Sequence, residues 1–257
     1  MDREPLLRVR DLALQFGGVT ALAGVSFDLE EGSIVGLIGP NGAGKTTLFN
    51  CISRLYTPSR GEIAFRGCSI LHLPPHRIAP LGIGRTFQNL ALFPRLSVLD
   101  NVMIGVHCRS RSDFLSDALR LPRVGREERR VRAQAQALLA ELGLEAVAAT
   151  PVGALTFVTQ KRVELARALA LAPVLLLLDE PAGGLNHIEI QDLNRQVRAL
   201  RDQRKLSVLL VEHHMQMVMA VSDRVVAFDF GRKIAEGTPE EVQNHPDVIR
   251  AYLGAAA

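Results

Sequence analysis

A glycine-rich segment from residue 39 to residue 47 reads Gly-Pro-Asn-Gly-Ala-Gly-Lys-Thr-Thr and fits the spacing of a phosphate-binding loop. Glycines let backbone N–H groups turn towards phosphate oxygens. Lys45 is expected to neutralise the β and γ phosphates, and the Thr46 hydroxyl is expected to ligate Mg²⁺. The segment predicts a nucleotide site built by Gly39, Asn41, Gly42, Ala43, Gly44, Lys45, Thr46 and Thr47.

The elements on either side of this loop suit phosphate binding. The apolar run Ser33–Ile38 predicts a buried strand, and residues 46 to 53 predict a helix. A helix directs the positive end of its dipole at an anion bound before its first turn. The alternative is a glycine turn that binds nothing, and the strand and helix around the loop disfavour it.

Two carboxylates end a second apolar run. The run Leu175–Leu178 precedes Asp179 and Glu180, as expected of a central parallel strand whose C-terminal end carries a site. Asp179 is expected to hold Mg²⁺ through a water, and Glu180 to polarise an attacking water. The alternative is a helix cap that follows a core strand. The phosphate loop earlier in the chain favours the catalytic interpretation.

Composition allows a folded protein and excludes few functions. The 257 residues are 47% hydrophobic, enough for one large domain or for a domain with an inserted subdomain. A net charge of +3 is too small to indicate a nucleic-acid partner. We expect a cytoplasmic chain, because we find no apolar signal segment and no membrane-spanning run. Cys51, Cys68 and Cys108 lack metal-ligand spacing, so we expect buried small hydrophobes in a reducing compartment.

The order of the elements predicts an α/β fold. Short strands from about residue 6 to 36 indicate an antiparallel layer, and residues 61 to 70 indicate a strand pair. Helical periodicity then predicts a helical insertion, over 98–106, 112–121 and 126–142, with Gly143 as a helix stop. An α/β pattern returns afterwards, with helices over 159–171 and 189–204, strands over 174–178 and 207–211, and one or two short helices in the tail over 239–253.

Taken together, these motifs resemble the ABC-type ATPases along essentially the whole chain. The matching features, in the family's order, are the phosphate loop, Gln88 within 85–89, the segment 163–169, Asp179 with Glu180, the turn 181–186 and His213. The segments 16–18, 85–88 and 211–213 and the ending 244–254 are similar to the ATPase subunits of branched-chain amino-acid importers.

The resemblance implies one ABC ATP-binding domain over residues 1–257, with the P-loop fold of nucleoside triphosphatases. Its RecA-like core and antiparallel β subdomain would occupy about 1–88 and 159–238, its helical subdomain about 89–158, and a helical tail about 239–257. The resemblance also implies ATP as ligand and Mg²⁺ as its metal. Transmembrane permease subunits would be the direct partners at the inner face of the cell membrane, and an external solute-binding protein would act indirectly.

Further residue roles follow from the resemblance. Gln88 would lie in the loop that links nucleotide chemistry to the membrane partner, where its amide can bond Mg²⁺ or a water. His213 would donate a hydrogen bond to the γ-phosphate. Phe16 would stack on adenine, and burial of Phe16 in the β layer is the alternative. His214 is expected to be structural, although the family usually has an acidic residue there.

One segment departs from the family. The family signature, L-S-G-G-Q or L-x-Y-G-Q, begins a helix and grips the γ-phosphate held by the opposite subunit, whereas this chain has Leu155, Thr156, Phe157, Val158 and Thr159. Val158 replaces the glycine and Thr159 the glutamine. Valine adds bulk and stiffness, and if the glycine conformation is required, strain of about 1–3 kcal/mol follows. We therefore expect a degenerate signature that closes its composite site poorly.

The sequence favours the ATP-hydrolysing subunit of an importer of branched-chain or other small amino acids or amides. A heterodimer with a second ABC ATPase subunit is preferred, because intact phosphate-binding residues stand beside an altered signature; a homodimer is the alternative. Two other functions stay open: a soluble ABC ATPase without a transport role, and a nucleotide-binding regulatory subunit with little turnover. No nucleic-acid partner is expected.

Overall fold

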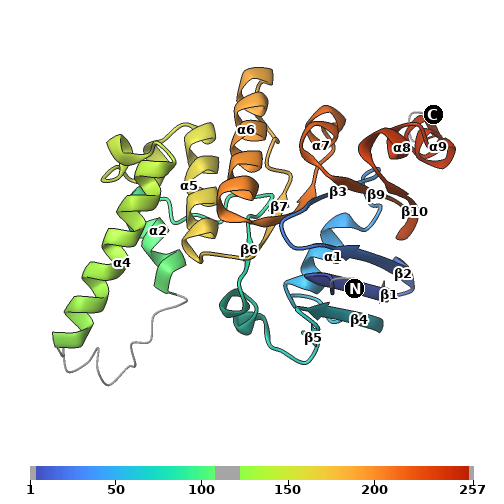
Figure 1. Cartoon of the computed structure of the whole chain (residues 1–257), viewed down its shortest axis with the longest axis horizontal. Helices are drawn as coiled ribbons and strands as arrows, with labels where there is room; N and C mark the ends of the chain where they lie inside the picture. Colours follow the sequence, from blue (N-terminus) through green and yellow to red (C-terminus); the bar gives the residue numbers. More distant parts are fainter. Residues whose placement is uncertain (1–3, 108–121, 255–257) are drawn as a thin grey trace. The chain divides into compact units, whose positions relative to one another are not determined.

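The computed structural model describes residues 4–107 and 122–254, which form two compact units (Figure 1). The first unit comprises Met1–Ile78 and Val174–Ala257, and the second comprises Ala79–Pro173. The predicted division into a core, a helical subdomain over 89–158 and a tail remains a prediction, since the two compact units divide the chain elsewhere.

The first unit contains the expected antiparallel layer, but its first two strands are long, not short, and its N-terminal stretch ends at Leu29 because Ile34–Ile38 joins the second, parallel sheet. Its strands follow the order β2-β1-β4-β5. The Gly17–Gly18 turn between the two long strands has positive φ at both residues, which glycine adopts without steric cost. The strands are β1 (Leu7–Phe16), β2 (Val19–Leu29), β4 (Arg60–Phe65) and β5 (Cys68–Ser69).

A second sheet in the first unit places the chemistry-bearing residues. Its strands follow the order β10-β9-β3-β8-β7, and β3 pairs in parallel with both β8 and β9. Every residue of β3, β7 and β8 is buried, which explains their continuous apolar runs. Because these strands are parallel, their carboxyl ends lie at one edge. The bounds are β3 (Ile34–Ile38), β7 (Leu175–Asp179), β8 (Ser207–Val211), β9 (Arg224–Asp229) and β10 (Arg232–Gly237).

Helices cover both faces of this parallel sheet, with α6 and α7 on one face and α1 on the other (Figure 1). Helix α6 begins two residues before the predicted start, because Asn186 and Glu189 form a reciprocal capping box. The tail forms two short helices. The helices of the first unit are α1 (Lys45–Ile52), η1 (Pro75–Arg77), α6 (His187–Arg204), α7 (Met215–Val221), α8 (Pro239–Gln243) and α9 (Pro246–Gly254).

The second unit is mainly helical, and α2 packs against both α4 and α5. Gly143 has a φ of 64° and follows the end of α4, as predicted. The helix predicted over 112–121 lies outside the described residues. The elements of this unit are η2 (Ala79–Leu81), β6 (Ile83–Arg85), α2 (Val98–His107), α4 (Pro122–Glu141), η3 (Glu145–Val147), η4 (Val152–Ala154) and α5 (Phe157–Ala170).

The cysteines differ from one another. Cys51 is buried in α1, and this burial raises the pKa of its thiol to about 11. Cys68 is exposed, so the expectation of burial is wrong for this residue, which begins β5, the two-residue strand at the edge of its sheet. Cys108 lies outside the described residues. Among the described helices, none has both the length and the apolar character to cross a bilayer.

Candidate nucleotide site

The phosphate loop connects β3 to α1, as predicted. Gly39 has a φ of 148° and Gly44 a φ of 100°, and a Cβ would meet the Phe228 oxygen at 2.3 Å and the Ala21 oxygen at 2.5 Å. Both positions therefore require glycine for backbone conformation and for space. Gly42 has a φ of 81° but opens onto free space, so the loop is accessible there.

Lys45 is folded onto the loop that it follows. Its side chain is buried, and its Nζ donates to the carbonyl oxygens of Gly39 at 2.7 Å and Pro40 at 2.9 Å. Burial lowers the pKa of Lys45, while the charges of Glu180 and Asp179 act in the opposite direction. Lys45 in the phosphate loop therefore interacts electrostatically with the two carboxylates at the end of β7.

The carboxyl ends of β7 and β8 bring an acidic and an imidazole group together. Asp179 is buried as the last residue of β7, and Glu180 follows with a φ of 48°, which turns the chain away from the sheet. The Glu180 N–H donates to the carbonyl of Val211 at 2.8 Å. The Nδ1 of His213 lies 3.8 Å from the Glu180 Oε2, and the His213 side chain is half-exposed.

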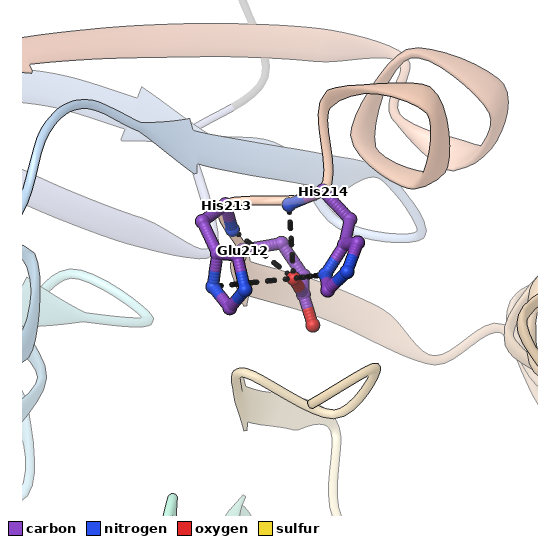
Figure 2. A group of neighbouring side chains, drawn as sticks. All are labelled: Glu212, His213 and His214. Carbon is purple, nitrogen blue, oxygen red and sulfur yellow. Dashed lines mark hydrogen bonds and ion pairs between the residues drawn. The ribbon is translucent and has the colours of Figure 1, made fainter. Parts of the chain in front are cut away.

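Glu212 lies beside His213, with 3.9 Å between its Oε2 and the His213 Nδ1, and the sequence predicted no role for it. Figure 2 shows the rings of His213 and His214 on either side of its carboxylate, which is fully buried. The carboxylate accepts hydrogen bonds from backbone and side-chain donors. His214 is one of these donors, in keeping with its expected structural role. No spacing motif identifies such a residue, because its partner Ala182 lies on a different strand end.

A tyrosine from the tail was missed for the same reason. The Tyr252 hydroxyl accepts a hydrogen bond from the Gly39 N–H at 2.8 Å, which connects α9 with the first glycine of the phosphate loop. A cleft of about 540 Å³ lies between the loop residues 40–43 and the α9 residues 247–251. The tail thus supports the loop from the side of α9.

Phe16 ends β1 and is 46% exposed, so the alternative of burial in the β layer is wrong. Its ring packs edge to face with Tyr56, with centroids 5.1 Å apart. Stacking of Phe16 on adenine stays a prediction.

Gln88 belongs to the second unit and is exposed in the loop after β6. The loop is anchored by Glu164, whose Oε1 accepts from the N–H of Phe87 at 3.2 Å and of Ala91 at 3.3 Å. Burial raises the pKa of Glu164, and these two bonds and Arg167 oppose the shift. The sequence predicted no separate role for Glu164 within the segment 163–169, and its burial on α5 is visible only in the structure.

The signature segment also belongs to the second unit. Thr156 is the N-cap of α5, and its Oγ1 accepts from the Thr159 N–H and lies 2.9 Å from the Thr159 Oγ1. Val158 lies in the first helical turn and is absent from the described residues with positive φ. The condition for backbone strain at Val158, a conformation open only to glycine, is therefore not met. The added bulk of Val158 and the replacement of glutamine by Thr159 remain as the predicted causes of poor closure.

The donor set at β7 and α1 fits Mg²⁺. Asp179 offers a buried carboxylate and Thr46 an exposed hydroxyl at the start of α1, and hard oxygen ligands of this kind suit that ion. Gln88, the third predicted ligand, lies in the other unit.

The combination of a parallel sheet, a phosphate loop after β3 and a carboxylate pair after β7 defines a P-loop nucleoside triphosphatase. The family model described as "ABC transporter" matches residues 22–183, and one described as "Branched-chain amino acid ATP-binding cassette transporter" matches residues 232–257. The chain belongs to the ABC transporter family of ATP-binding cassettes.

Two curated relatives and two solved structures illustrate this membership. The chain is 42% identical to the high-affinity branched-chain amino acid transport ATP-binding protein BraF of Pseudomonas aeruginosa, over 98% of this chain and 99% of the relative. It is 42% identical to LivG of Salmonella typhimurium over the same shares. A nucleotide-free ATP-binding cassette of an ABC transporter aligns with a TM-score of 0.84 at 30% identity, over 97% of this chain and 99% of the other. The ADP conformation of an ATP-binding cassette of an ABC transporter aligns with a TM-score of 0.83 at 29% identity, over 98% of this chain and 100% of the other.

These findings confirm the predicted resemblance, the α/β P-loop fold and ATP as the ligand. Family membership also implies ATP hydrolysis and work within a transport complex that includes a membrane permease.

Proposed function

We propose that this chain hydrolyses ATP to energise an importer of branched-chain amino acids or other small amino acids or amides. The observation that carries the proposal is the 42% identity to BraF over 98% of this chain, since it includes the tail as well as the nucleotide site. The separate match of residues 232–257 to a branched-chain cassette model supports the same solute class.

The chemistry assigned to the site is in-line attack of water on the γ-phosphate. Glu180 orients the water and accepts its proton, and His213 donates a hydrogen bond to a phosphate oxygen. Lys45 and the loop amides stabilise negative charge. Asp179, Thr46 and Gln88 would hold Mg²⁺, which neutralises phosphate charge when bound. The separation of 3.8 Å between Glu180 and His213 supports a shared site for these two residues.

The adenine end of the nucleotide is assigned to Phe16. Its exposed ring at the end of β1, next to the ring of Tyr56, supports stacking on a base. Base stacking contributes about 1–3 kcal/mol in nucleic-acid systems, so its loss would weaken affinity more than chemistry.

The partners are assigned from the similarity to ATP-binding proteins of branched-chain amino acid transport. The chain docks on permease subunits at the inner face of the cell membrane and meets the external solute-binding protein only indirectly. The anchored loop that carries Gln88 is the segment assigned to the permease contact. The solute itself is recognised by the other components of the importer.

The altered signature favours a heterodimer with a second ABC ATPase subunit. In that arrangement Lys45, Glu180 and His213 face an intact signature of the partner, while Val158 and Thr159 of this chain leave the other composite site degenerate. In a homodimer both sites would carry the altered segment and turnover would be slow. The side chains of Val158 and Thr159, in place of glycine and glutamine, support this asymmetry.

A nucleotide-binding regulatory subunit with little turnover is the second candidate, and the same two residues favour it. The two functions differ in the rate of the isolated complex. A competent heterodimer hydrolyses ATP under stimulation by its permease, whereas a regulatory subunit binds ATP with the same affinity and turns it over negligibly.

The test is affinity purification of the tagged chain from membranes, followed by mass spectrometry and an ATPase assay of the purified complex. We expect permease chains, a second ABC ATPase subunit and ATP hydrolysis. Recovery of this chain as the only ATPase would contradict the heterodimer. Recovery of ribosomes or DNA-repair proteins in place of a permease would contradict the importer. A complex with permease but without hydrolysis would favour the regulatory subunit.

A further inference from the structure

The buried carboxylate of Glu212 accepts four hydrogen bonds. Its Oε1 accepts from the Ala182 N–H at 2.6 Å. Its Oε2 accepts from the N–H of His213 at 3.0 Å, from the N–H of His214 at 3.2 Å and from the Nδ1 of His214 at 3.2 Å. Since a carboxylate only accepts, the His214 ring must carry its proton on Nδ1. Hydrogen bonds to an ionised group are stronger than neutral ones.

These bonds join two segments that are distant in sequence. Ala182 lies in the turn after β7, two residues beyond Glu180, whereas Glu212 and His213 follow β8. The backbones of β7 and β8 pair in parallel up to Asp179 and Val211. Beyond that last pair, the Glu212 side chain extends the connection between the two strand ends through Ala182, next to the contact between Glu180 and His213.

We propose that Glu212 is a positioning residue that sets the separation between Glu180 and His213. The proposal rests on the proposed function for its kinetic consequence, since both neighbours are assigned to hydrolysis there. One oxygen of Glu212 holds the turn that follows Glu180, and the other holds the backbone that carries His213. A shift of either segment would therefore move Glu180 or His213.

The same three residues also have the arrangement of a metal site. Ligand atoms of Glu212, His213 and His214 lie within 4.8 Å of one another, a group found among the described residues. However, Oε2 already accepts three N–H donors, and the His214 Nδ1 that would face an ion carries a proton. The hydrogen-bonding pattern therefore favours positioning over metal binding.

The sharpest variant is Glu212→Asp. It keeps the charge and can still accept from the amides of His213 and His214, but it is one methylene too short to reach Ala182. We expect kcat to fall about 10- to 100-fold, as for a misplaced catalytic group, while the Kd for ATP changes less than threefold.

Glu212→Gln should lower kcat as well, because its NH2 group must face an N–H donor in either orientation. His214→Phe is the control of matched size, which removes one donor and should change kcat less than threefold.

Two measurements without hydrolysis separate this proposal from the proposed function. In Glu212→Asp we expect amide hydrogen exchange at Ala182 to accelerate at least tenfold, and the imidazole resonances of His213 to shift in NMR spectra.

Normal folding with kcat of both Glu212 variants within twofold of the parent would overturn the proposal. If the parent complex does not hydrolyse ATP, the proposed function fails instead, and unshifted His213 resonances would then overturn the positioning role. Saturable binding of Zn²⁺ that Glu212→Asp abolishes would count for the metal alternative and against the proposal.

Discussion

The phosphate loop and the first turn of α5 differ in whether the fold requires glycine there. In the loop, Gly39 and Gly44 have positive φ, and a Cβ at either position would collide with a backbone oxygen. At the start of α5, Val158 has ordinary helical geometry and Thr156 caps the helix through its hydroxyl. The fold itself demands glycine in the loop, whereas it accepts valine in α5.

This difference separates two kinds of sequence change. A substitution at Gly39 acts on folding and on nucleotide binding together. The family glycine that Val158 replaces is not needed to build the helix, so we expect its value to lie in the close approach of a phosphate. Loss of that glycine is therefore compatible with a stable protein, and we expect its consequence to lie in turnover.

The largest expected effect comes from Glu180→Gln. A positioned general base contributes about 10²- to 10⁴-fold, so hydrolysis by the purified complex should fall by that factor while ATP binding persists. The loss should be as large when the signature segment is restored to the family pattern, because the restored segment supplies no base. Glu62→Gln, on the exposed part of β4, is the matched control. Retained hydrolysis in Glu180→Gln would remove this residue from the role of base.

Gly39→Ala tests the demand for glycine in the loop. We expect its free energy of unfolding to drop by about 1–3 kcal/mol, because the new methyl group meets the Phe228 oxygen. Gly42→Ala is the control, since its φ is also positive but its Cβ would meet open space. Chemical denaturation should rank Gly39→Ala as less stable than Gly42→Ala. Equal stability of the two variants would mean that the loop adapts more readily than its geometry indicates.

Val158→Gly combined with Thr159→Gln restores the family residues in α5. If bulk at Val158 impairs closure, turnover should rise about tenfold, which corresponds to about 1.4 kcal/mol of activation free energy. Stability should change little, with about 1 kcal/mol as the cost of glycine in a helix. A homodimer of the variant is the most sensitive sample, because both composite sites change. Unchanged turnover there would show that the altered signature is not defective.

Sequence patterns predicted the elements that depend on local residue order. The phosphate loop, the apolar run ending at Asp179 and the strand ending at Val211 all lie where they were expected. The helix predicted from Thr159 begins at Phe157, because the cap formed by Thr156 extends it by two residues. Local chemistry of this kind can be recovered from the sequence once the cap is considered.

The residues that support the site could not be predicted in the same way. Glu212 bonds a residue 30 positions away, and Tyr252 bonds one 213 positions away. Such contacts depend on which strand ends and helices become neighbours in the fold. No spacing rule within one segment contains that information, so both residues became visible only in the structure.

The smallest expected effect comes from Tyr252→Phe, which removes the hydroxyl that accepts from the Gly39 N–H. A single intramolecular hydrogen bond contributes about 0.5–1.5 kcal/mol, so we expect the Kd for ATP to rise by about two- to tenfold with kcat nearly unchanged. The two strongest demands on Gly39, its φ and its lack of space for a Cβ, are untouched by this change. If Tyr252→Phe weakened ATP binding as strongly as Gly39→Ala, the loop would depend on the tail more than on its own glycines.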